Sequence, residues 1–293
     1  MTGLKSILRD TTGQSEEYLQ SLYTRAFQRH PFTALCAVLR VGGMSDAHWD
    51  PLEESIRGFD DFNWLLQQAQ QHRGARAARR IALLMYCQAV EMSPAHEMLV
   101  DLLYAVAGSA YNAAPLHHLR QQRKSGTIPP SAKRKLNEIK RIALEAGESI
   151  LKELIDSFFR EDIRNAFSHS DYILGENFLR WTESGAPIDV SFENLDMLID
   201  NCFAFYGALL RLQQEWLIGL ARTRRFHRWP QYEVLELLRS GNPAIVYGFR
   251  VHFSNGAKAT FARQAAGVEA DNIFLPRQQN LWMYSGSGSF PSV

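Results

Sequence analysis

Cysteine is scarce in this chain of 293 residues, and the three that occur, Cys36, Cys87 and Cys202, lie far apart. No Cys-x-x-Cys pair exists and the number is odd, which argues against a disulfide framework and against a cysteine zinc site. Each cysteine lies among apolar residues, so we expect each to pack in the core as a small hydrophobic side chain.

Long apolar runs and an excess of charge of one sign are also lacking. The longest apolar stretch, residues 81–90, is only about ten residues long, which is too short to cross a bilayer. Residues 1–13 show no charged-then-apolar signal pattern, so we expect a cytoplasmic protein in a reducing setting. The formal net charge is +1, so any binding of nucleic acid has to come from local basic patches.

Several common catalytic and cofactor motifs do not occur in the sequence. There is no glycine-rich phosphate loop, no His-Glu-x-x-His helix, and no Gly-x-Ser-x-Gly elbow in the region expected to fold. His117 and His118 are adjacent, but neighbouring residues on a helix or strand point apart, and a solvated loop is the simpler interpretation. The sequence therefore predicts no metal site and no cofactor.

The chain does contain long amphipathic helical patterns. Residues 75–112 hold two apolar helical stretches, and residues 131–167 hold a wide apolar stripe with steps of three and four. Gly147 marks a place where this stripe could divide into two helices in tandem. A second long helix is predicted over residues 192–222, with Ser191 as its N-terminal cap. Long helices with broad apolar faces are typical of a helical bundle.

Other patterns dominate the ends of the chain. Residues 1–72 predict short helices joined by turns, and residues 172–181 predict a small hairpin. Residues 232–238 predict a short helix, and Asn255-Gly256 gives a strong signal for a second hairpin. We therefore predict a mainly α fold in three parts: an N-terminal helical extension over 1–72, a helical bundle over 73–225, and a small C-terminal α/β module with a flexible tail over 226–293.

One stretch, from Phe159 to Tyr172, carries a constellation that points to chemistry. In it Arg164 is followed directly by Asn165, and His169 comes five positions after the arginine. Two other Arg-to-His pairs in the chain have the same spacing, but in neither does asparagine follow the arginine. The stretch also lies at the end of the longest amphipathic helical pattern.

This stretch resembles the HEPN superfamily, whose nucleases carry an Arg-polar-x(3 to 5)-His motif near a helix end in a helical bundle. The resemblance covers about residues 75–225. It implies a HEPN-like bundle and a metal-independent endoribonuclease with Arg164, Asn165 and His169 as its catalytic residues. It also implies a homodimer whose two motifs face each other, and a toxin or phage-defence context with a possible antitoxin or regulatory partner.

RNA cleavage by internal transesterification explains why these residue types are used. A histidine can take the proton of a ribose 2′-OH or give one to the leaving 5′ oxygen at neutral pH. A guanidinium presents a planar fork of donors to the charged oxygens of the phosphorane. In this scheme His169 is the acid or base, Arg164 stabilises the phosphorane, and Asn165 orients the histidine or a phosphate oxygen.

The same residues also have a purely structural interpretation. Glu161 lies three residues before Arg164 and could pair with it on a helix face, while His169 near a helix C-terminus suits the helix dipole. The chain would then be a non-catalytic HEPN-fold dimer that binds a partner or senses a nucleotide. Residues five apart on a helix point about 140° apart, so Arg164 and His169 converge if the helix ends between them or the long arginine curls round.

Further candidates surround the motif. Ser168, Asp171 and Tyr172 could contact phosphate or orient His169, although helix-end capping is an equal alternative. Glu91, on an otherwise apolar helix, could lean into the site or face solvent.

A second basic cluster lies after the last long helix. Arg222, Arg224 and Arg225, with Phe226 and Trp229 nearby, combine cations with aromatic rings and suit the binding of RNA. A charged junction between domains is the alternative.

Overall fold

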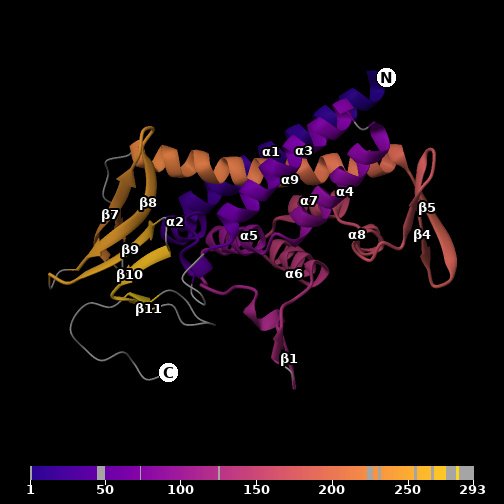
Figure 1. Ribbon diagram of the computed structural model, residues 1–293. Helices are drawn as coiled ribbons and strands as arrows, with labels where there is room; N and C mark the ends of the chain where they lie inside the picture. Colours follow the sequence, from indigo (N-terminus) through magenta and orange to yellow (C-terminus); the bar gives the residue numbers. More distant parts are fainter. Residues whose placement is uncertain are drawn as a thin grey trace. The chain divides into compact units, whose positions relative to one another are not determined.

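The computed structural model describes residues 2–44, 50–72, 74–124, 126–222, 227–229, 232–253, 256–264, 267–274 and 282–283. These residues are mainly helical, with an antiparallel sheet in the C-terminal part of the chain, as Figure 1 shows. The predicted mainly α fold is confirmed at this level. No helix in the described part of the chain is long and apolar enough to cross a membrane.

Two compact units make up the chain. The first unit consists of Met1–Leu22, Pro51–His96 and Leu119–Leu210, and the second of Tyr23–Asp50, Glu97–His118 and Arg211–Val293. Three of the five divisions fall inside long helices, α1 (Thr2–Arg29), α5 (Ser93–Val106) and α9 (Phe192–Arg222), each of which contributes residues to both units.

The helical patterns of the central region are largely confirmed. The two stretches predicted within 75–112 are α4 (Ala75–Glu91) and α5, and the helix predicted over 192–222 is α9. As predicted, the Ser191 hydroxyl accepts a hydrogen bond from the Asn194 backbone N–H at 3.3 Å, which satisfies a donor at the start of α9.

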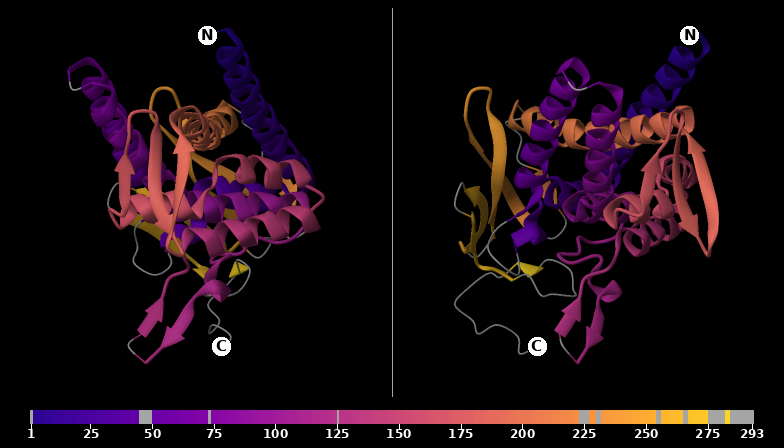
Figure 2. Two further views of the ribbon diagram at one scale, coloured as in Figure 1. Left: turned by 90° about the vertical axis from the view of Figure 1, so that its right-hand side faces the viewer. Right: turned by 45° about the vertical axis from the view of Figure 1, so that its right-hand side comes forward.

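The apolar stripe over 131–167 forms three helices, α6 (Ala132–Glu145), α7 (Ser149–Phe158) and α8 (Glu161–Ser168). The first break is at Gly147, whose φ of +78° closes α6 and favours glycine. The second break was not predicted, because the stripe continues through it. There Phe159 takes extended backbone angles, and the Tyr86 hydroxyl accepts a hydrogen bond from the Arg160 N–H at 3.0 Å. Helices α6 and α7 lie side by side in both figures of the whole chain (Figures 1 and 2).

The prediction of short helices over 1–72 is wrong for two elements. Helix α1 has 28 residues and α3 (Leu52–His72) has 21, whereas α2 (Pro31–Leu39) and the 3-10 turn η1 (Val41–Met44) are short. Pro31 begins α2, and Asp50-Pro51 lies directly before α3. Ser15-Glu16-Glu17, a combination common at helix starts, lies inside α1.

Two small sheets belong to the first unit. The predicted hairpin is confirmed as β3 (Tyr172–Leu174) and β4 (Phe178–Glu183), and a third strand, β5 (Ala186–Ser191), extends it in the order β3-β4-β5. In the segment predicted as a loop, the structure has the turn η2 (His117–Leu119) and a hairpin of β1 (Gln121–Arg123) with β2 (Gly126–Ile128). Figure 2 shows β4 and β5 as a curved ribbon next to α8.

The C-terminal sheet has the order β10-β9-β8-β7-β6 and is antiparallel throughout. The helix predicted over 232–238 is wrong: these residues lie in β7, where Leu235 is buried and pairs with Val251. The apolar residues of this segment fit both the helical period and the strand period. Pairing with β8 makes the segment a strand. The described residues thus form an all-β module, not the predicted α/β one. Its strands are β6 (His227–Trp229), β7 (Tyr232–Ser240), β8 (Ile245–His252), β9 (Lys258–Gln264), β10 (Gly267–Asp271), β11 (Ile273–Phe274) and β12 (Trp282–Met283).

The hairpin signal of the C-terminal region is confirmed in the pairing of β8 with β9. Gly256 in its turn has a φ of +82°, and its N–H donates to the Phe253 carbonyl at 3.0 Å. Asn255 and the predicted flexible tail lie outside the described residues.

The core of the second unit joins this sheet to α2. The ring of Phe249 on β8 meets Phe32 of α2 edge to face at 5.5 Å between centroids and stacks on Phe261 of β9 at 5.6 Å. Cys36 is buried in the same cluster, and Cys87 and Cys202 are buried in the first unit, as predicted for small core side chains. Sequence segments far apart therefore share one apolar core.

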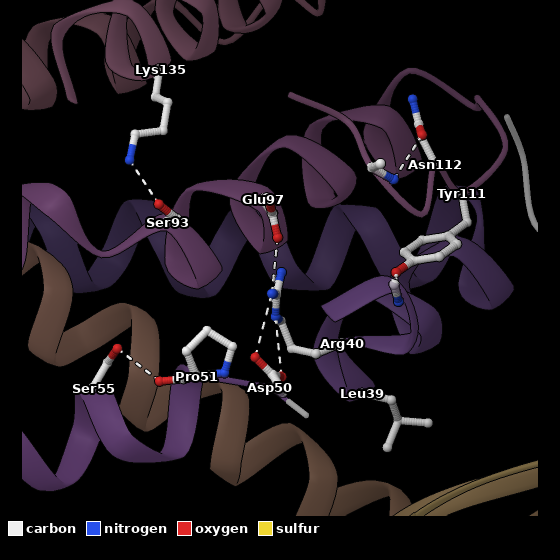
Figure 3. Close-up of polar contacts among 12 residues, drawn as sticks. Leu39, Arg40, Asp50, Pro51, Ser55, Ser93, Glu97, Tyr111, Asn112 and Lys135 are labelled. Atoms are coloured by element: carbon white, nitrogen blue, oxygen red, sulfur yellow. Dashed lines mark hydrogen bonds and ion pairs between the residues drawn. The ribbon is translucent and has the colours of Figure 1, made fainter. Parts of the chain in front are cut away.

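A buried ion network runs beside this core. Figure 3 shows the Arg40 guanidinium between the carboxylates of Asp50 and Glu97, at 3.4 Å and 2.9 Å. On the other side of the network, Arg263 of β9 lies 2.8 Å from Asp50. The side chains of Arg40 and Asp50 are only 4% and 1% exposed, and such burial is tolerated only because each charge has a partner.

We predict that Gly248→Ala lowers the free energy of unfolding by about 1–3 kcal/mol. A Cβ at this position of β8 would lie 2.2 Å from the Phe261 carbonyl oxygen, so the two strands would have to move apart. Denaturant unfolding measures the change. The matched control is Gly207→Ala inside α9, where a Cβ meets nothing within 4 Å and where alanine should stabilise the helix by about 0.5–1 kcal/mol. Equal effects of the two changes would contradict the close approach.

Candidate functional site

Helix α8 presents the predicted motif. It has eight residues, and Ile163 and Ala166 bury its inner face. The helix ends at Ser168 with His169 as its C-terminal cap, so the expected helix end near His169 is confirmed. Ser170 follows with a φ of +60°, and the Asp171 N–H donates back to the Ala166 carbonyl at 2.9 Å. This turn leaves His169 exposed at the end of the helix.

Arg164 is held by a neighbouring helix. Its Nη2 lies 2.5 Å from Oε1 of Glu91 at the end of α4, and its Nη1 donates to Oδ1 of Asn165 at 2.9 Å. The side chains of Arg164 and Glu91 are 29% and 34% exposed, so the pair is only partly open to water. The alternative pairing with Glu161 is wrong, because the Glu161 carboxylate lies 2.6 Å from Lys133.

A second cation reaches the same carboxylate. The buried side chain of Lys135 on α6 has its Nζ 3.8 Å from Oε2 of Glu91 and donates to the Ser93 hydroxyl at 2.8 Å, a contact drawn in Figure 3. We call Glu91, Lys135 and Arg164 the Glu91 cluster. It joins three helices and holds two cations for one carboxylate. The sequence did not decide whether Glu91 leans into the site or faces solvent. In the structure its carboxylate contacts Arg164 of the motif.

An open pocket of about 200 Å³ lies on the other side of the motif. Asn165, His169 and Asp171 line it from α8 and its C-terminal turn. The opposite wall comes from β4, through Trp181, Thr182 and Glu183. The structure thus brings Asn165 and His169 to one cavity.

Arg164 is not among the described residues that line this pocket, since its guanidinium is directed to Glu91. Among the described residues, no hydrogen bond or ion pair joins the side chains of Arg164 and His169. The side chains of Arg164 and His169 can converge if the helix ends between them. Helix α8 does end between them, at Ser168.

The charge of the pocket is acidic. Asp171 and Glu183 are exposed carboxylates of its wall. A third carboxylate, Asp162, also lines it and forms a two-point ion pair with Arg160 at 2.5 and 2.9 Å. Burial opposes ionisation of Asp162, but the hydrogen bonds and charge of Arg160 outweigh it and leave the pKa of Asp162 below its usual value. The Asp162 carboxyl therefore stays ionised near neutral pH.

The two other auxiliary candidates lie elsewhere. Ser168 favours the ionised form of the Cys87 thiol of α4, but burial has the larger effect and raises the pKa of that thiol to about 11. The Tyr172 ring packs against Phe167 at 5.3 Å between centroids. Both side chains interact at the end of α8, whereas Asp171 is the auxiliary candidate that reaches the pocket.

The predicted RNA-binding arginines are only partly described. Arg222 is exposed at the end of α9, while Arg224 and Arg225 lie outside the described residues, so that surface stays a prediction. Within the described part of the chain, no group of three or more His, Cys, Asp or Glu side chains is arranged to hold a metal ion.

Comparison of the chain with protein-family models, with curated proteins and with solved structures finds no match. The resemblance to the HEPN superfamily therefore stays a prediction from the motif. The wall formed by β4 was missed by the sequence reasoning, although the hairpin itself was predicted. The alternation of apolar and polar residues in β4 could have indicated this wall, because Leu179 and Trp181 are buried and Thr182 is exposed.

We predict that Ser170→Gly raises the free energy of unfolding by about 0.5–1 kcal/mol, because glycine adopts a positive φ without a steric penalty. Ser170→Val should lower it, since a β-branched side chain fits this conformation poorly. Thermal or denaturant unfolding of the three proteins measures the order Gly, Ser, Val. The reverse order would show that the turn after His169 is not left-handed.

Proposed function

We propose that the chain is a metal-independent endoribonuclease that cleaves RNA by attack of a ribose 2′-OH on the adjacent phosphate. The observation that carries the proposal is that Asn165 and the exposed His169 share an open pocket at the end of α8, next to the cationic Arg164. The resemblance of the motif to HEPN nucleases supports the same reaction. The products are a 2′,3′-cyclic phosphate and a free 5′ hydroxyl.

His169 transfers protons in this reaction. Its exposure at a helix end lets a phosphodiester approach the ring from solvent. An imidazole can remove the 2′-OH proton as the oxygen attacks phosphorus, or protonate the 5′ oxygen as the P–O bond breaks. One imidazole does one of these transfers at a time, and the predicted homodimer would bring a second copy of His169 for the other.

Arg164 would stabilise the phosphorane. Its planar fork of donors suits two equatorial oxygens, and positioned charge of this kind is often the largest contribution to such catalysis. Asn165 accepts a hydrogen bond from Arg164 and lines the pocket, so it links the guanidinium to the His169 side of α8. In this proposal the RNA phosphate competes with Glu91 for the guanidinium.

The second candidate is a non-catalytic dimer that binds a partner or a nucleotide. One observation favours it: the Arg164 guanidinium is already paired with Glu91 at 2.5 Å. A cleavage role in toxin or phage defence, a cytoplasmic location and an antitoxin or regulatory partner belong to the nuclease proposal and follow from the motif's resemblance alone.

We predict that the purified protein cleaves mixed RNA in EDTA and that His169→Ala lowers the rate by about 100-fold or more, as expected for loss of a general acid or base. Gel analysis gives the rate, and 3′ ends that resist an ordinary phosphatase until mild acid opens the ring to a monophosphate identify the cyclic phosphate. The control is His72→Ala, which removes an exposed histidine at the end of α3.

Equal cleavage by the wild type and by His169→Ala would remove His169 from the reaction. An absence of cleavage in all three proteins, with folding and dimerisation intact, would favour the binding module.

We also predict that Glu91→Gln strengthens RNA binding while lowering the free energy of unfolding by about 1–2 kcal/mol. The change leaves Arg164 and Lys135 without their shared carboxylate, so more positive charge faces RNA. Binding measured against salt concentration should become steeper by about one phosphate contact, a slope change of roughly 0.7–0.9. The matched control, Glu161→Gln, removes a carboxylate of α8 that pairs with Lys133 of α6. A loss of stability without any change in the salt slope would favour the non-catalytic candidate.

A further inference from the structure

We propose that the pocket between α8 and β4 binds one nucleobase of the RNA and selects bases that carry an exocyclic amino group over uracil. This inference rests on the proposed function and deepens it, because it assigns a base-binding subsite to residues that the cleavage chemistry does not use. The subsite residues are Asp171, Trp181, Thr182 and Glu183, and His169 borders them.

The size and position of the pocket suit a single base. Its volume of about 200 Å³ is below the range of roughly 300–1,000 Å³ typical for larger ligands, so it fits one small planar group better than a stretch of chain. Because His169 lines the same pocket, a base held there lies next to the group proposed to act on the phosphate. The base would therefore belong to a nucleotide at the cleaved bond.

The carboxylates of Asp171 and Glu183 disfavour a phosphate directly beside them in the pocket. Asp162 also lines the pocket, but its charge is matched by Arg160. The cationic Arg164 lies in the Glu91 cluster on another side of the helix. A nucleotide would meet this charge pattern with its phosphate toward Arg164 and its base toward the acidic wall.

The acidic wall also indicates which base edges fit. An ionised carboxylate is an acceptor only, and Asp and Glu side chains accept hydrogen bonds from the amino groups of bases such as cytosine. Adenine, cytosine and guanine each present an amino group. Uracil presents two carbonyl oxygens on either side of one N–H, and these oxygens would face the carboxylates unfavourably.

Trp181 supplies an independent observation at the same site. Its side chain lines the pocket and is only 5% exposed, and its buried indole Nε1 has no hydrogen-bond partner among the described residues. An indole N–H can only donate, and a buried donor left unpaired costs about 1–3 kcal/mol. Because this atom is buried, a ring nitrogen or carbonyl oxygen of a base would satisfy it only after the Trp181 ring turns toward the pocket on binding. The Trp181 N–H is a donor and the carboxylates of the pocket are acceptors. An amino-bearing base presents both an amino donor and an acceptor on one edge, so it can match them.

The first test maps the bases at the cleavage sites of a random RNA library by sequencing the cut ends. We expect the wild type to prefer an amino-bearing base over uracil by about tenfold at one position next to the cut, the range given by one good hydrogen-bonded pair. Glu183→Gln should reduce that preference severalfold. The control, Glu176→Gln, changes an exposed residue in the β3–β4 turn that does not line the pocket, and it should leave the preference unchanged.

Asp171→Asn is a second variant of the wall, and it keeps the test decisive if Glu183→Gln folds poorly. Cleavage with no base preference beside the cut, or with the same preference in both wall variants, would overturn the inference and leave the nuclease proposal standing.

The second test needs no cleavage. Cytidine, adenosine, guanosine and uridine are titrated into the full-length protein, and the indole N–H resonance of Trp181, assigned with Trp181→Phe, is followed by NMR. We expect the three amino-bearing nucleosides to shift it more than uridine, and Glu183→Gln to weaken their binding. Nucleoside binding of this kind in a protein that does not cut RNA would overturn the nuclease proposal and support the subsite. No shift with any nucleoside would overturn the subsite.

Discussion

The ion pair between Arg164 and Glu91 is the contact on which the arrangement of the motif depends. Helix α8 has only eight residues, and a helix of that length is not stable by itself in water, so packing and fixed charges have to hold it. Ile163 supplies the packing, and the ion pair of Arg164 with Glu91 ties α8 to α4. His169 lies at the end of the helix that is held in this way.

This contact also separates the charges around the motif. The cations Arg164 and Lys135 gather at the Glu91 carboxylate, while Asp171 and Glu183 line the pocket on the β4 side. The histidine lies at the border between the two regions. Under the proposed function, the phosphate of an RNA nucleotide would lie on the side of the cations and its base on the side of the acidic pocket.

Local features of this fold could be predicted from the sequence, and long-range contacts could not. The end of α8 at His169 and the hairpin of β3 and β4 follow from changes of hydrophobic period over a few neighbouring residues. The pairing of Arg164 with Glu91 joins residues from different helices, and Glu161 was the nearer choice in sequence. The strand β7 was mistaken for a helix for a related reason, since its pairing with β8 outweighs local preference. For the candidate site, the residues of the motif were therefore predictable and the opposite wall was not.

The burial of Phe249 against Phe32 means that the C-terminal sheet does not finish its own core. Asp50 has the same consequence for charge, because it neutralises both Arg40, near the N-terminal side of the chain, and Arg263 of β9. Ending the protein after α9 would uncover Phe32 of α2 and leave the Asp50 carboxylate without Arg263. The sheet therefore completes the burial of Phe32 and the charge pairing of Asp50, and it could not be exchanged for another module without redesign of α2.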